Sequence, residues 1–156
     1  MIKFEAVSKE FDGARALDNL TFEIEAGEFF ILVGKSGSGK TTTLKMINRL
    51  IEPSQGKIYR HNQAIKDLDL RSLRLDTGYV LQQGALFPNL TVEENIELIP
   101  EMKKWPKAKR QQAVQDLMTK VGLAPDKYKD RYPSQLSGGE QQRVGILRAI
   151  ISQPQL

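Results

Sequence analysis

The sequence predicts an α/β fold with a strand-rich first part and a helical second part. Three observations support this prediction. The apolar run Phe29–Val33 leads directly into a glycine-rich segment, which is followed by apolar residues at helical spacing. Before that run, Leu20, Phe22 and Ile24 alternate with polar residues, as in a strand with one buried face. From Thr91 onward, the apolar residues recur with the period of a helix.

The first part contains the predicted strands. Three of them form an antiparallel sheet and comprise Ile2–Val7, Asn19–Glu25 and Lys57–Tyr59. The last of these leads into a turn at His61-Asn62. Two further segments, Phe29–Val33 and Thr77–Leu81, are predicted to be buried strands of a parallel core sheet.

Helices are predicted from apolar residues at positions i, i+3, i+4 and i+7. The helix after the glycines is expected to bury one face and to stop at Pro53; its apolar residues are Leu44, Ile47, Leu50 and Ile51. A second helix begins near Pro106 and stops at Gly122; its apolar residues are Val114, Leu117, Met118 and Val121. A third helix follows Arg143 and has Val144, Leu147 and Ile151 on its apolar face.

Composition restricts the class of protein. The chain has 156 residues, 40% of them hydrophobic, and no cysteine, which suits one globular domain in a reducing compartment. No apolar run approaches the roughly 20 residues of a membrane span, so we expect the chain by itself to be soluble and cytosolic. A basic cluster, Lys103, Lys104, Lys107, Lys109 and Arg110, is flanked by Glu101 and Asp116. This mixture favours a solvated helix face over a nucleic-acid patch.

The segment from Gly34 to Thr41 fits the P-loop pattern G-x-x-x-x-G-K-[ST]. In such a loop, backbone N–H groups surround the β- and γ-phosphates, and the next helix points its positive N-terminal end at them. Lys40 then supplies charge, and Thr41 supplies a Mg²⁺ ligand. A purely structural glycine turn between a strand and a helix is the alternative. The order of strand, loop and helix favours a nucleoside triphosphate site.

A second motif, Leu136-Ser137-Gly138-Gly139-Glu140-Gln141-Gln142-Arg143, precedes the third helix. Ser137 and Glu140 fit a capping box, so the segment could simply begin a helix. Capping does not require two consecutive glycines, which lower helix propensity by roughly 1 kcal/mol each. Gly138 and Gly139 leave the helix N-terminus bare, which favours an anion site over a purely structural start.

Together the P-loop, the LSGGEQ segment and the intervening Leu81-Gln82-Gln83 resemble the ATPase subunit of an ATP-binding-cassette (ABC) transporter. The resemblance runs from Phe4 to the last residue. It implies a P-loop NTPase core, an N-terminal antiparallel β-subdomain and an inserted α-helical subdomain, C-terminally incomplete. We assign the β-subdomain and core strands to residues 1–85 and the helical subdomain with its signature helix to residues 86–156, within one partial ATPase domain.

The resemblance also implies a role for individual residues. Phe11 stacks on the adenine, and Lys40 and Gln82 are catalytic. Thr41 and Gln82 contact Mg²⁺, and Gln82 also reaches the attacking water. The triphosphate and Mg²⁺ are held by Gly34, Lys35, Ser36, Gly37, Ser38, Gly39, Lys40, Thr41 and Thr42. The γ-phosphate held by the other subunit is contacted by Ser137, Gly138, Gly139 and Gln141, so the working unit is a head-to-tail dimer with two ATP molecules.

Some of these residues have simpler interpretations. Phe11 could be an ordinary core aromatic residue, and Gln82 could be a strand terminator. His61 is the only histidine, but it lies in the predicted turn of a hairpin. We therefore expect it to be a turn residue and not the switch histidine of the family.

The sequence departs from the family pattern at its end, because Gln153-Pro154-Gln155-Leu156 stands where the Walker B strand should follow. The resemblance then leaves the Mg²⁺-binding aspartate, the catalytic glutamate and the switch histidine outside this sequence. Phosphoryl transfer needs a group that orients the attacking water. We expect the chain to bind ATP but to hydrolyse it weakly or not at all. The core strands are expected to have unpaired edges, so the chain would be a piece of a longer ATPase.

The type of transporter is inferred from the stretches Leu86–Ile96 and Ile99–Trp105, with Asp67-Leu68-Asp69 and Gln82-Gln83. They resemble importers of quaternary-ammonium osmoprotectants such as glycine betaine, carnitine and choline. Amino-acid importers, a non-transport ABC ATPase and a module that only binds ATP are the alternatives. The implied partners are a second ATPase subunit, membrane permease subunits and an extracytoplasmic solute-binding protein, without nucleic acid, at the cytoplasmic face of the cell membrane.

Overall fold

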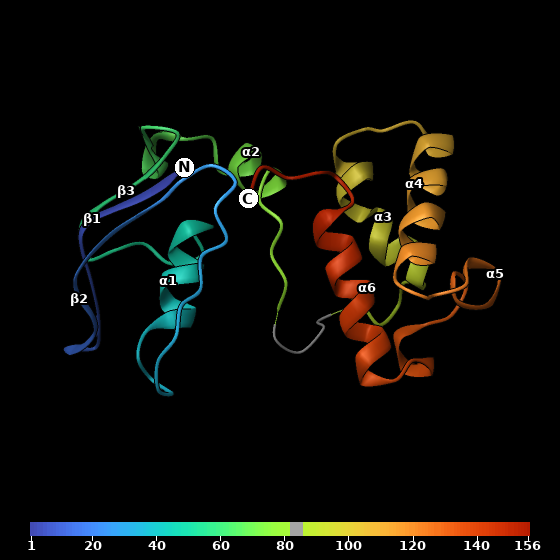
Figure 1. The fold of residues 1–156 in the computed structure, drawn as a ribbon, viewed down its shortest axis with the longest axis horizontal. Helices are drawn as coiled ribbons and strands as arrows, with labels where there is room; N and C mark the ends of the chain where they lie inside the picture. Colours follow the sequence, from blue (N-terminus) through green and yellow to red (C-terminus); the bar gives the residue numbers. More distant parts are fainter. Residues whose placement is uncertain (82–85) are drawn as a thin grey trace. The chain divides into compact units, whose positions relative to one another are not determined.

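The structure is a computed structural model of residues 1–156, of which it describes residues 1–81 and 86–156. The chain divides into two compact units, Met1–Leu73 and Arg74–Leu156 (Figure 1). The sequence-based ranges 1–85 and 86–156 stay a prediction. In the described part of the chain, no helix is both long enough and apolar enough to cross a membrane.

The first unit is built on a four-stranded antiparallel sheet with the order β2-β1-β3-β4. Its strands are β1 (Ile2–Phe11), β2 (Ala14–Ile24), β3 (Gln55–Arg60) and β4 (Gln63–Ala64). Phe4 of β1 lies opposite Phe22 of β2 on one side and Ile58 of β3 on the other. The three predicted strands of this sheet are therefore confirmed, and β1 and β2 are longer than expected.

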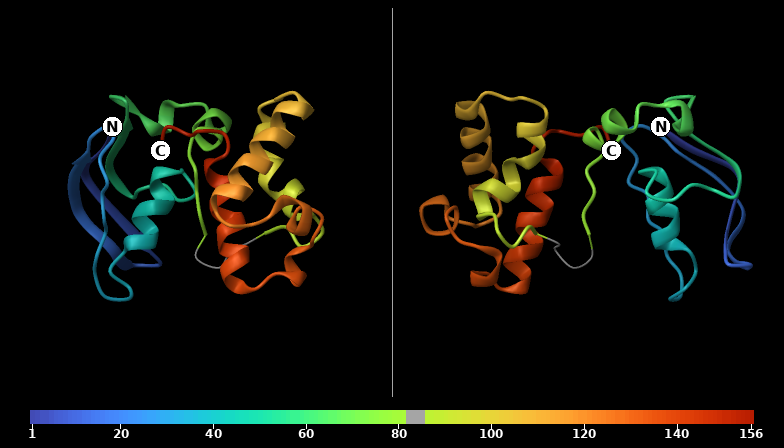
Figure 2. Two further views of the ribbon diagram at one scale, coloured as in Figure 1. Left: turned by 45° about the vertical axis from the view of Figure 1, so that its right-hand side comes forward. Right: turned by 180° about the vertical axis from the view of Figure 1, so that it is seen from behind.

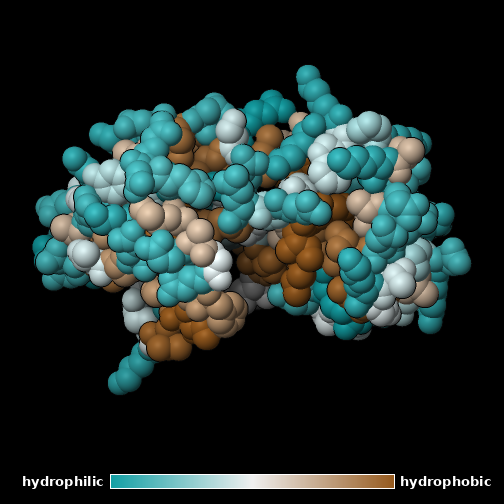
Figure 3. Space-filling model, turned by 45° about the horizontal axis from the view of Figure 1, so that its top comes forward, coloured by the Kyte–Doolittle hydropathy of each residue, from teal (hydrophilic) through white to brown (hydrophobic). Residues whose placement is uncertain are grey.

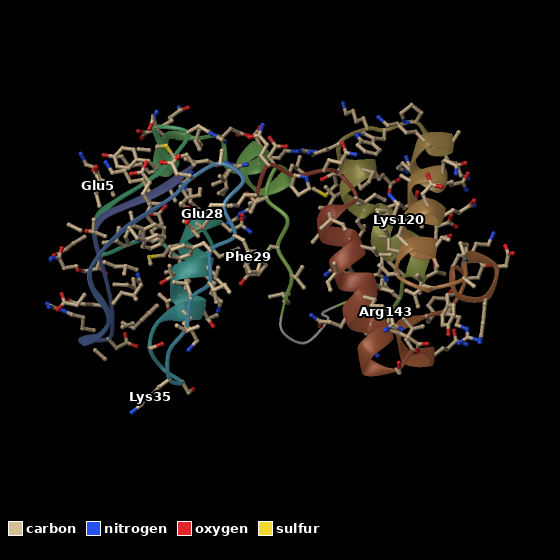
Figure 4. The ribbon with its side chains drawn as sticks, viewed as in Figure 1. Glu5, Glu28, Phe29, Lys35, Lys120 and Arg143 are labelled. Atoms are coloured by element: carbon tan, nitrogen blue, oxygen red, sulfur yellow. The ribbon has the colours of Figure 1, made fainter. Side chains whose placement is uncertain are left out.

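Helix α1 (Lys40–Ile47) packs on one face of this sheet. The apolar core between them contains Ile2, Phe4, Val7, Leu17, Met46, Ile47, Ile58 and Ile65. Alternation in β1 and β3 places Ile2, Phe4 and Ile58 on the inner face, whereas Glu5 points away from α1 (Figure 4). A short 3₁₀ turn, η1 (Ile65–Asp67), and helix α2 (Leu70–Leu75) follow the hairpin.

The predicted helix after the glycines is shorter than its apolar pattern suggested. It ends at Ile47, with Asn48 as the C-cap, and the next residue, Arg49, has a positive φ of 48°. Leu44 and Leu50 are about half exposed instead of buried. The chain therefore leaves the helix before Pro53, because the left-handed conformation at Arg49 ends the helical hydrogen-bonding pattern.

The two predicted core strands are not strands in this structure. Phe29–Val33 and Thr77–Leu81 have no ladder partner among the described residues. Phe29 is 88% exposed and Val33 86% exposed, and the ring of Phe29 stands out from the ribbon (Figure 4). A strand forms only where a second segment accepts and donates its hydrogen bonds, so an apolar run alone does not produce one. Hydrophobic side chains accordingly lie at the surface of the first unit (Figure 3).

The second unit is helical, as predicted. Its elements are α3 (Val92–Met102), α4 (Lys107–Lys120), α5 (Pro125–Tyr128), η2 (Pro133–Gln135) and α6 (Gly138–Ile150). Helices α3, α4 and α6 lie side by side (Figures 1 and 2). Their shared core includes Val92, Ile96, Val114, Met118, Leu123, Val144 and Leu147. The predicted helix starting near Pro106 is confirmed, and Gly122 follows its end with a φ of 73°.

A buried asparagine organises the start of this unit. Asn95 of α3 is fully buried and its amide makes four hydrogen bonds. Its Oδ1 accepts from the Phe87 N–H at 2.8 Å, and its Nδ2 donates to the carbonyls of Phe87, Leu90 and Thr91. A capping box between Thr91 and Glu94 fixes the same turn. Asn95 thus ties residues 87–91 to the helix that they precede.

Candidate nucleotide-binding site

The glycine-rich loop turns sharply into α1. Gly37 and Gly39 have φ values of 82° and 84°, a left-handed conformation that glycine adopts without steric penalty. The helix begins at Lys40, and Gly39 provides no side-chain cap. The first N–H groups of α1 therefore have no acceptor within the helix. Such a bare N-terminus is what an anionic phosphate requires.

Gly39 is also fixed by its packing on β2. A Cβ atom at this position would lie 2.4 Å from the Leu17 Cδ2 and 2.9 Å from the Ala16 carbonyl oxygen. At Gly37, by contrast, a Cβ would meet nothing within 4 Å. The loop is therefore packed closely against β2 at Gly39 and has free space around Gly37.

Lys40 holds the loop in its curved form. Its ammonium donates hydrogen bonds to the carbonyls of Gly34 and Lys35, both at 2.8 Å, and to the Ser38 hydroxyl at 3.3 Å. A turn bond from the Ser38 N–H to the Lys35 carbonyl, at 3.2 Å, closes the same loop. Lys35 lies at the tip, with its side chain directed away from α1 (Figure 4). The positive charge of Lys40 thus lies within the curve formed by residues 34–39.

Threonines in the first turn of α1 differ in their surroundings. Thr41 is exposed and Thr42 partly exposed, so both hydroxyls can be reached from solvent. Thr43 is 2% exposed, and its hydroxyl donates to the Gly39 carbonyl at 3.0 Å. The exposed Thr41 hydroxyl fits the oxygen ligand that Mg²⁺ prefers. Thr43 anchors the helix start; sequence analysis missed it, although a threonine four residues after a loop glycine often bonds back to that carbonyl.

Phe11 ends β1 next to a two-residue turn, Asp12-Gly13, in which both residues have positive φ. The residue is 42% exposed, and the Lys9 ammonium lies 4.9 Å from the centroid of the Phe11 ring. The alternative that Phe11 is an ordinary core residue does not agree with this exposure. The hairpin turn and the glycine loop lie at the same end of the first unit (Figures 1 and 2).

In the second unit, the LSGGEQ segment begins α6 with the predicted capping box. The Glu140 carboxylate accepts from the Ser137 N–H at 2.7 Å and from the Ser137 hydroxyl at 2.8 Å. The Glu140 N–H in turn donates to the Ser137 hydroxyl at 3.4 Å. These bonds, first from the Ser137 backbone, then from its side chain and from Tyr128, lower the pKa of Glu140 from 4.5 to about 2. The helix start is therefore well ordered and carries a firmly ionised carboxylate.

The two glycines of this segment are not required by packing. A Cβ at Gly138 or Gly139 would meet nothing within 4 Å, and neither residue has a positive φ. Their side of the helix N-terminus is therefore open to an approaching group. Gln141 is turned the other way, because its amide donates to the carbonyls of Pro133 and Leu136. Gln82, which with Lys40 was assigned a catalytic role, lies outside the described residues.

The first unit thus holds Phe11 and residues Gly34–Thr42, and the second unit holds Ser137, Gly138, Gly139 and Gln141. The glycine loop and the start of α6 each have the chemistry of an anion site. Their roles in binding remain predictions.

Comparison with known proteins identifies a matching family and similar sequences. A family model described as "ABC transporter" matches residues 17–156. The chain is 48% identical over 157 residues to "Glycine betaine/carnitine/choline transport ATP-binding protein OpuCA" of Bacillus subtilis (strain 168), a match that covers 100% of this chain and 41% of that protein. It therefore spans less than half the length of this curated relative.

Two further matches bear on function and fold. "Glutamate transport ATP-binding protein GluA" of Corynebacterium efficiens is 38% identical, over 100% of this chain and 65% of that protein. A solved dimeric structure of an ATP-binding cassette in a post-hydrolysis state, bound to ADP and Pi, superposes with a TM-score of 0.89 at 36% identity. That superposition covers 99% of this chain and 71% of the solved chain.

Proposed function

Since this chain belongs to the ABC transporter family, we propose that it forms the ATP-binding part of an importer ATPase. The observation that carries the proposal is the glycine loop at the start of α1. It combines a bare helix N-terminus, two left-handed glycines and the Lys40 ammonium within one short turn. The fold of an α/β P-loop NTPase, supported by the superposition on solved cassettes, is the setting in which such a loop binds phosphates.

We assign the nucleotide contacts to residues that the structure leaves accessible. Lys40 and the N–H groups of the loop would face the phosphates, Thr41 would provide an oxygen for Mg²⁺, and Phe11 would offer a ring face to the adenine. When bound, Mg-ATP supplies the phosphoanhydride bond whose hydrolysis drives transport. The chain's own contribution is to position the phosphates and to neutralise their charge.

The LSGGEQ segment is proposed to act on a second subunit. Ser137, Gly138, Gly139 and Gln141 would contact the γ-phosphate held by the partner, which makes the dimer head-to-tail. The open face above Gly138 and Gly139 supports this role, because nothing in the packing of the unit explains the glycines. Gln141 would have to release the Pro133 and Leu136 carbonyls to take part.

The assignment of the site to ATP is tested by thermal unfolding with and without Mg-ATP. Ligand at about 100 times its Kd stabilises a protein by roughly 2.7 kcal/mol, which corresponds to about 5–11 °C for a chain of this size. Lys40→Ala should remove the rise in melting temperature caused by Mg-ATP. The matched control is Lys45→Ala, which removes a lysine of the same helix outside the loop and should retain that rise. If Mg-ATP raised the melting temperature of both variants equally, the glycine loop would not be the site.

The signature role is tested with Gly139→Ala in the complete ATPase. Alanine is favoured over glycine in a helix by roughly 1 kcal/mol, so this variant should fold at least as well as the parent. Turnover of the dimer should nevertheless fall, because the added methyl group lies where the partner's phosphate would approach. Unchanged turnover would contradict the proposed contact.

For the substrate, we propose a quaternary-ammonium osmoprotectant, with an amino acid as the second candidate. The support is the 48% identity to OpuCA against 38% to GluA. In the complete transporter, the ATPase would act at the cytoplasmic face of the membrane with permease subunits and a solute-binding protein. Uptake of labelled glycine betaine and of labelled glutamate, measured in cells with and without the intact gene, distinguishes the two importers.

Two alternatives are separated by other measurements. Co-purification with ribosomes or DNA instead of a membrane permease would indicate a non-transport ABC ATPase. For the 156-residue chain itself, we propose ATP binding with weak or no hydrolysis, because the resemblance assigns no water-activating carboxylate within it. Phosphate release measured on the purified chain tests this, and brisk turnover would contradict it.

A further inference from the structure

We infer that the first unit has a second binding site, a basic cleft beside β3 that accepts an extended acidic peptide segment from a partner protein. The cleft has a volume of about 230 Å³. It is formed by β3, by the link between α1 and β3, and by η1. None of the residues proposed to bind ATP lines it.

The cleft runs along a sheet edge that is only partly covered. β4 pairs with Tyr59 and Arg60 alone. On this side, residues 55–58 of β3 therefore face no strand within the part of the chain that the structure describes. Gly56, Lys57 and Ile58 of this uncovered stretch line the cleft. An uncovered edge of this kind is where extended peptides add to a sheet.

Strand alternation shows which backbone groups point into the cleft. The N–H of His61 donates to the Met1 carbonyl, so the N–H groups of His61, Tyr59 and Lys57 are directed toward β1. The N–H of Ile58 then points to the opposite edge. Because a peptide unit is planar and trans, the Gly56 carbonyl points there as well. The cleft thus offers one donor and one acceptor at the spacing of an extended backbone.

Charge determines which peptide would bind. Three cationic side chains, Arg49, Lys57 and Lys66, line the cleft together with one carboxylate, Glu52. Glu52 is already paired with Arg49, whose Nη2 lies 3.3 Å from its Oε1. Arg49 is also held by a bond from its Nη1 to the Leu68 carbonyl at 3.1 Å. The surplus of positive charge favours acidic over basic segments.

The lysine on β3 is available for such a contact. Lys57 is exposed on the outer face of the sheet, opposite Glu5. Glu5 forms its closest ion pair with Lys3, at 2.6 Å. A carboxylate on an added strand beside Lys57 could therefore pair with the Lys57 ammonium, because Glu5, the acidic residue opposite Lys57, is already paired with Lys3. Its adjacent residues would face Ile58, Ile65 and Pro53, the apolar part of the lining.

The size of the cleft favours an extended segment over a cofactor. Small-molecule and cofactor sites are usually about 300–1,000 Å³ and largely enclosed, whereas this cleft is smaller and lies beside an open strand edge. A few residues of extended chain, alternating acidic and apolar, match its backbone groups and its charge.

The test measures binding of a fluorescent Glu-Val repeat peptide to the full chain by anisotropy, with a Lys-Val repeat as the comparison. Lys66→Glu, alone and with Lys57→Glu, should weaken binding of the Glu-Val peptide by roughly tenfold for the pair. The control is Arg71→Glu, an equal charge reversal on α2 outside the cleft, which should change binding of the Glu-Val peptide little. Melting curves establish that each variant is folded.

Two further peptides distinguish strand addition from attraction between charged side chains. One carries N-methyl groups on the backbone nitrogens of its glutamates, and the other on those of its valines. Each peptide has therefore lost the backbone N–H donors along one edge of its extended chain. If the peptide adds to the sheet as a strand, one of the two should lose affinity for the protein while the other retains it. The inference is overturned if both bind like the parent peptide, if the Lys-Val peptide or a single-stranded oligonucleotide binds as tightly, or if the charge reversals have no effect.

Discussion

Replacing Gly39 with alanine should damage the glycine loop far more than the same change at Gly37. Both residues have a left-handed φ, 84° and 82°, so both variants lose about 1–2 kcal/mol through the backbone alone. Only at Gly39 does the new methyl group meet other atoms, 2.4 Å from the Leu17 Cδ2 and 2.9 Å from the Ala16 oxygen. Overpacking of this kind costs about 1–3 kcal/mol more.

The difference can be measured by thermal unfolding of the two variants side by side. A change of 1 kcal/mol shifts the midpoint by about 2–4 °C for a chain of this size, so Gly39→Ala should unfold roughly 2–12 °C below Gly37→Ala. It should also lose more of the stabilisation by Mg-ATP. Midpoints within about 1 °C of each other would refute the proposed contact with β2.

A double substitution identifies the atoms responsible. Leu17→Ala removes the closer of the two contacts, so it should be less harmful in the Gly39→Ala background than in the parent. Residues in contact commonly show coupling of about 0.5–3 kcal/mol. Purely additive effects would locate the strain elsewhere in the loop.

Three other predictions concern stability. Asn95→Ala should lower the free energy of unfolding of the second unit by about 3 kcal/mol in urea titrations, because it removes the side-chain partner of the Phe87 N–H and of the Leu90 carbonyl; the Phe87 and Thr91 carbonyls each keep a backbone N–H donor. Gly56→Ala should be more destabilising than Gly13→Ala in the same assay: both have a φ of 82°, but only at Gly56 would a Cβ lie 2.3 Å from a backbone oxygen, that of Ala6. Since folding lowers the pKa of Glu140 from 4.5 to about 2, its ionised form stabilises the fold above about pH 4.5, and this contribution is lost as the pH falls toward 2. The melting temperature of Glu140→Gln should therefore be lower than that of the parent at neutral pH and approach it in that acidic range.

Features set by neighbouring residues in sequence were predictable. The capping box at Ser137 and Glu140 and the turn at His61 and Asn62 both formed as expected; the two turn residues have φ values of 49° and 64°. Each depends on the conformational preferences of a few consecutive residues. The helix after Pro106 was equally predictable, because its apolar period reports the single face that it buries.

Features that depend on distant segments were not predictable in this way. The apolar run Phe29–Val33 indicated burial, but pairing needs a second strand that a local pattern cannot provide. Likewise, nothing near Gly39 in the sequence reveals that Leu17 lies against it. Asn95 was overlooked because a buried amide is recognised only by the four bonds around it.

The Ser137 hydroxyl can donate its hydrogen bond to either of two acceptors. In this structure it donates to the Glu140 carboxylate at 2.8 Å, and this bond helps to keep the carboxylate ionised. A phosphate that accepts the same proton takes one donor away from Glu140, so the pKa of the carboxylate must rise. Occupation of the signature segment and protonation of Glu140 are then thermodynamically linked. Below about pH 4.5, nucleotide capture at this helix would draw a proton from solvent, and calorimetry in buffers of different ionisation enthalpy would detect it.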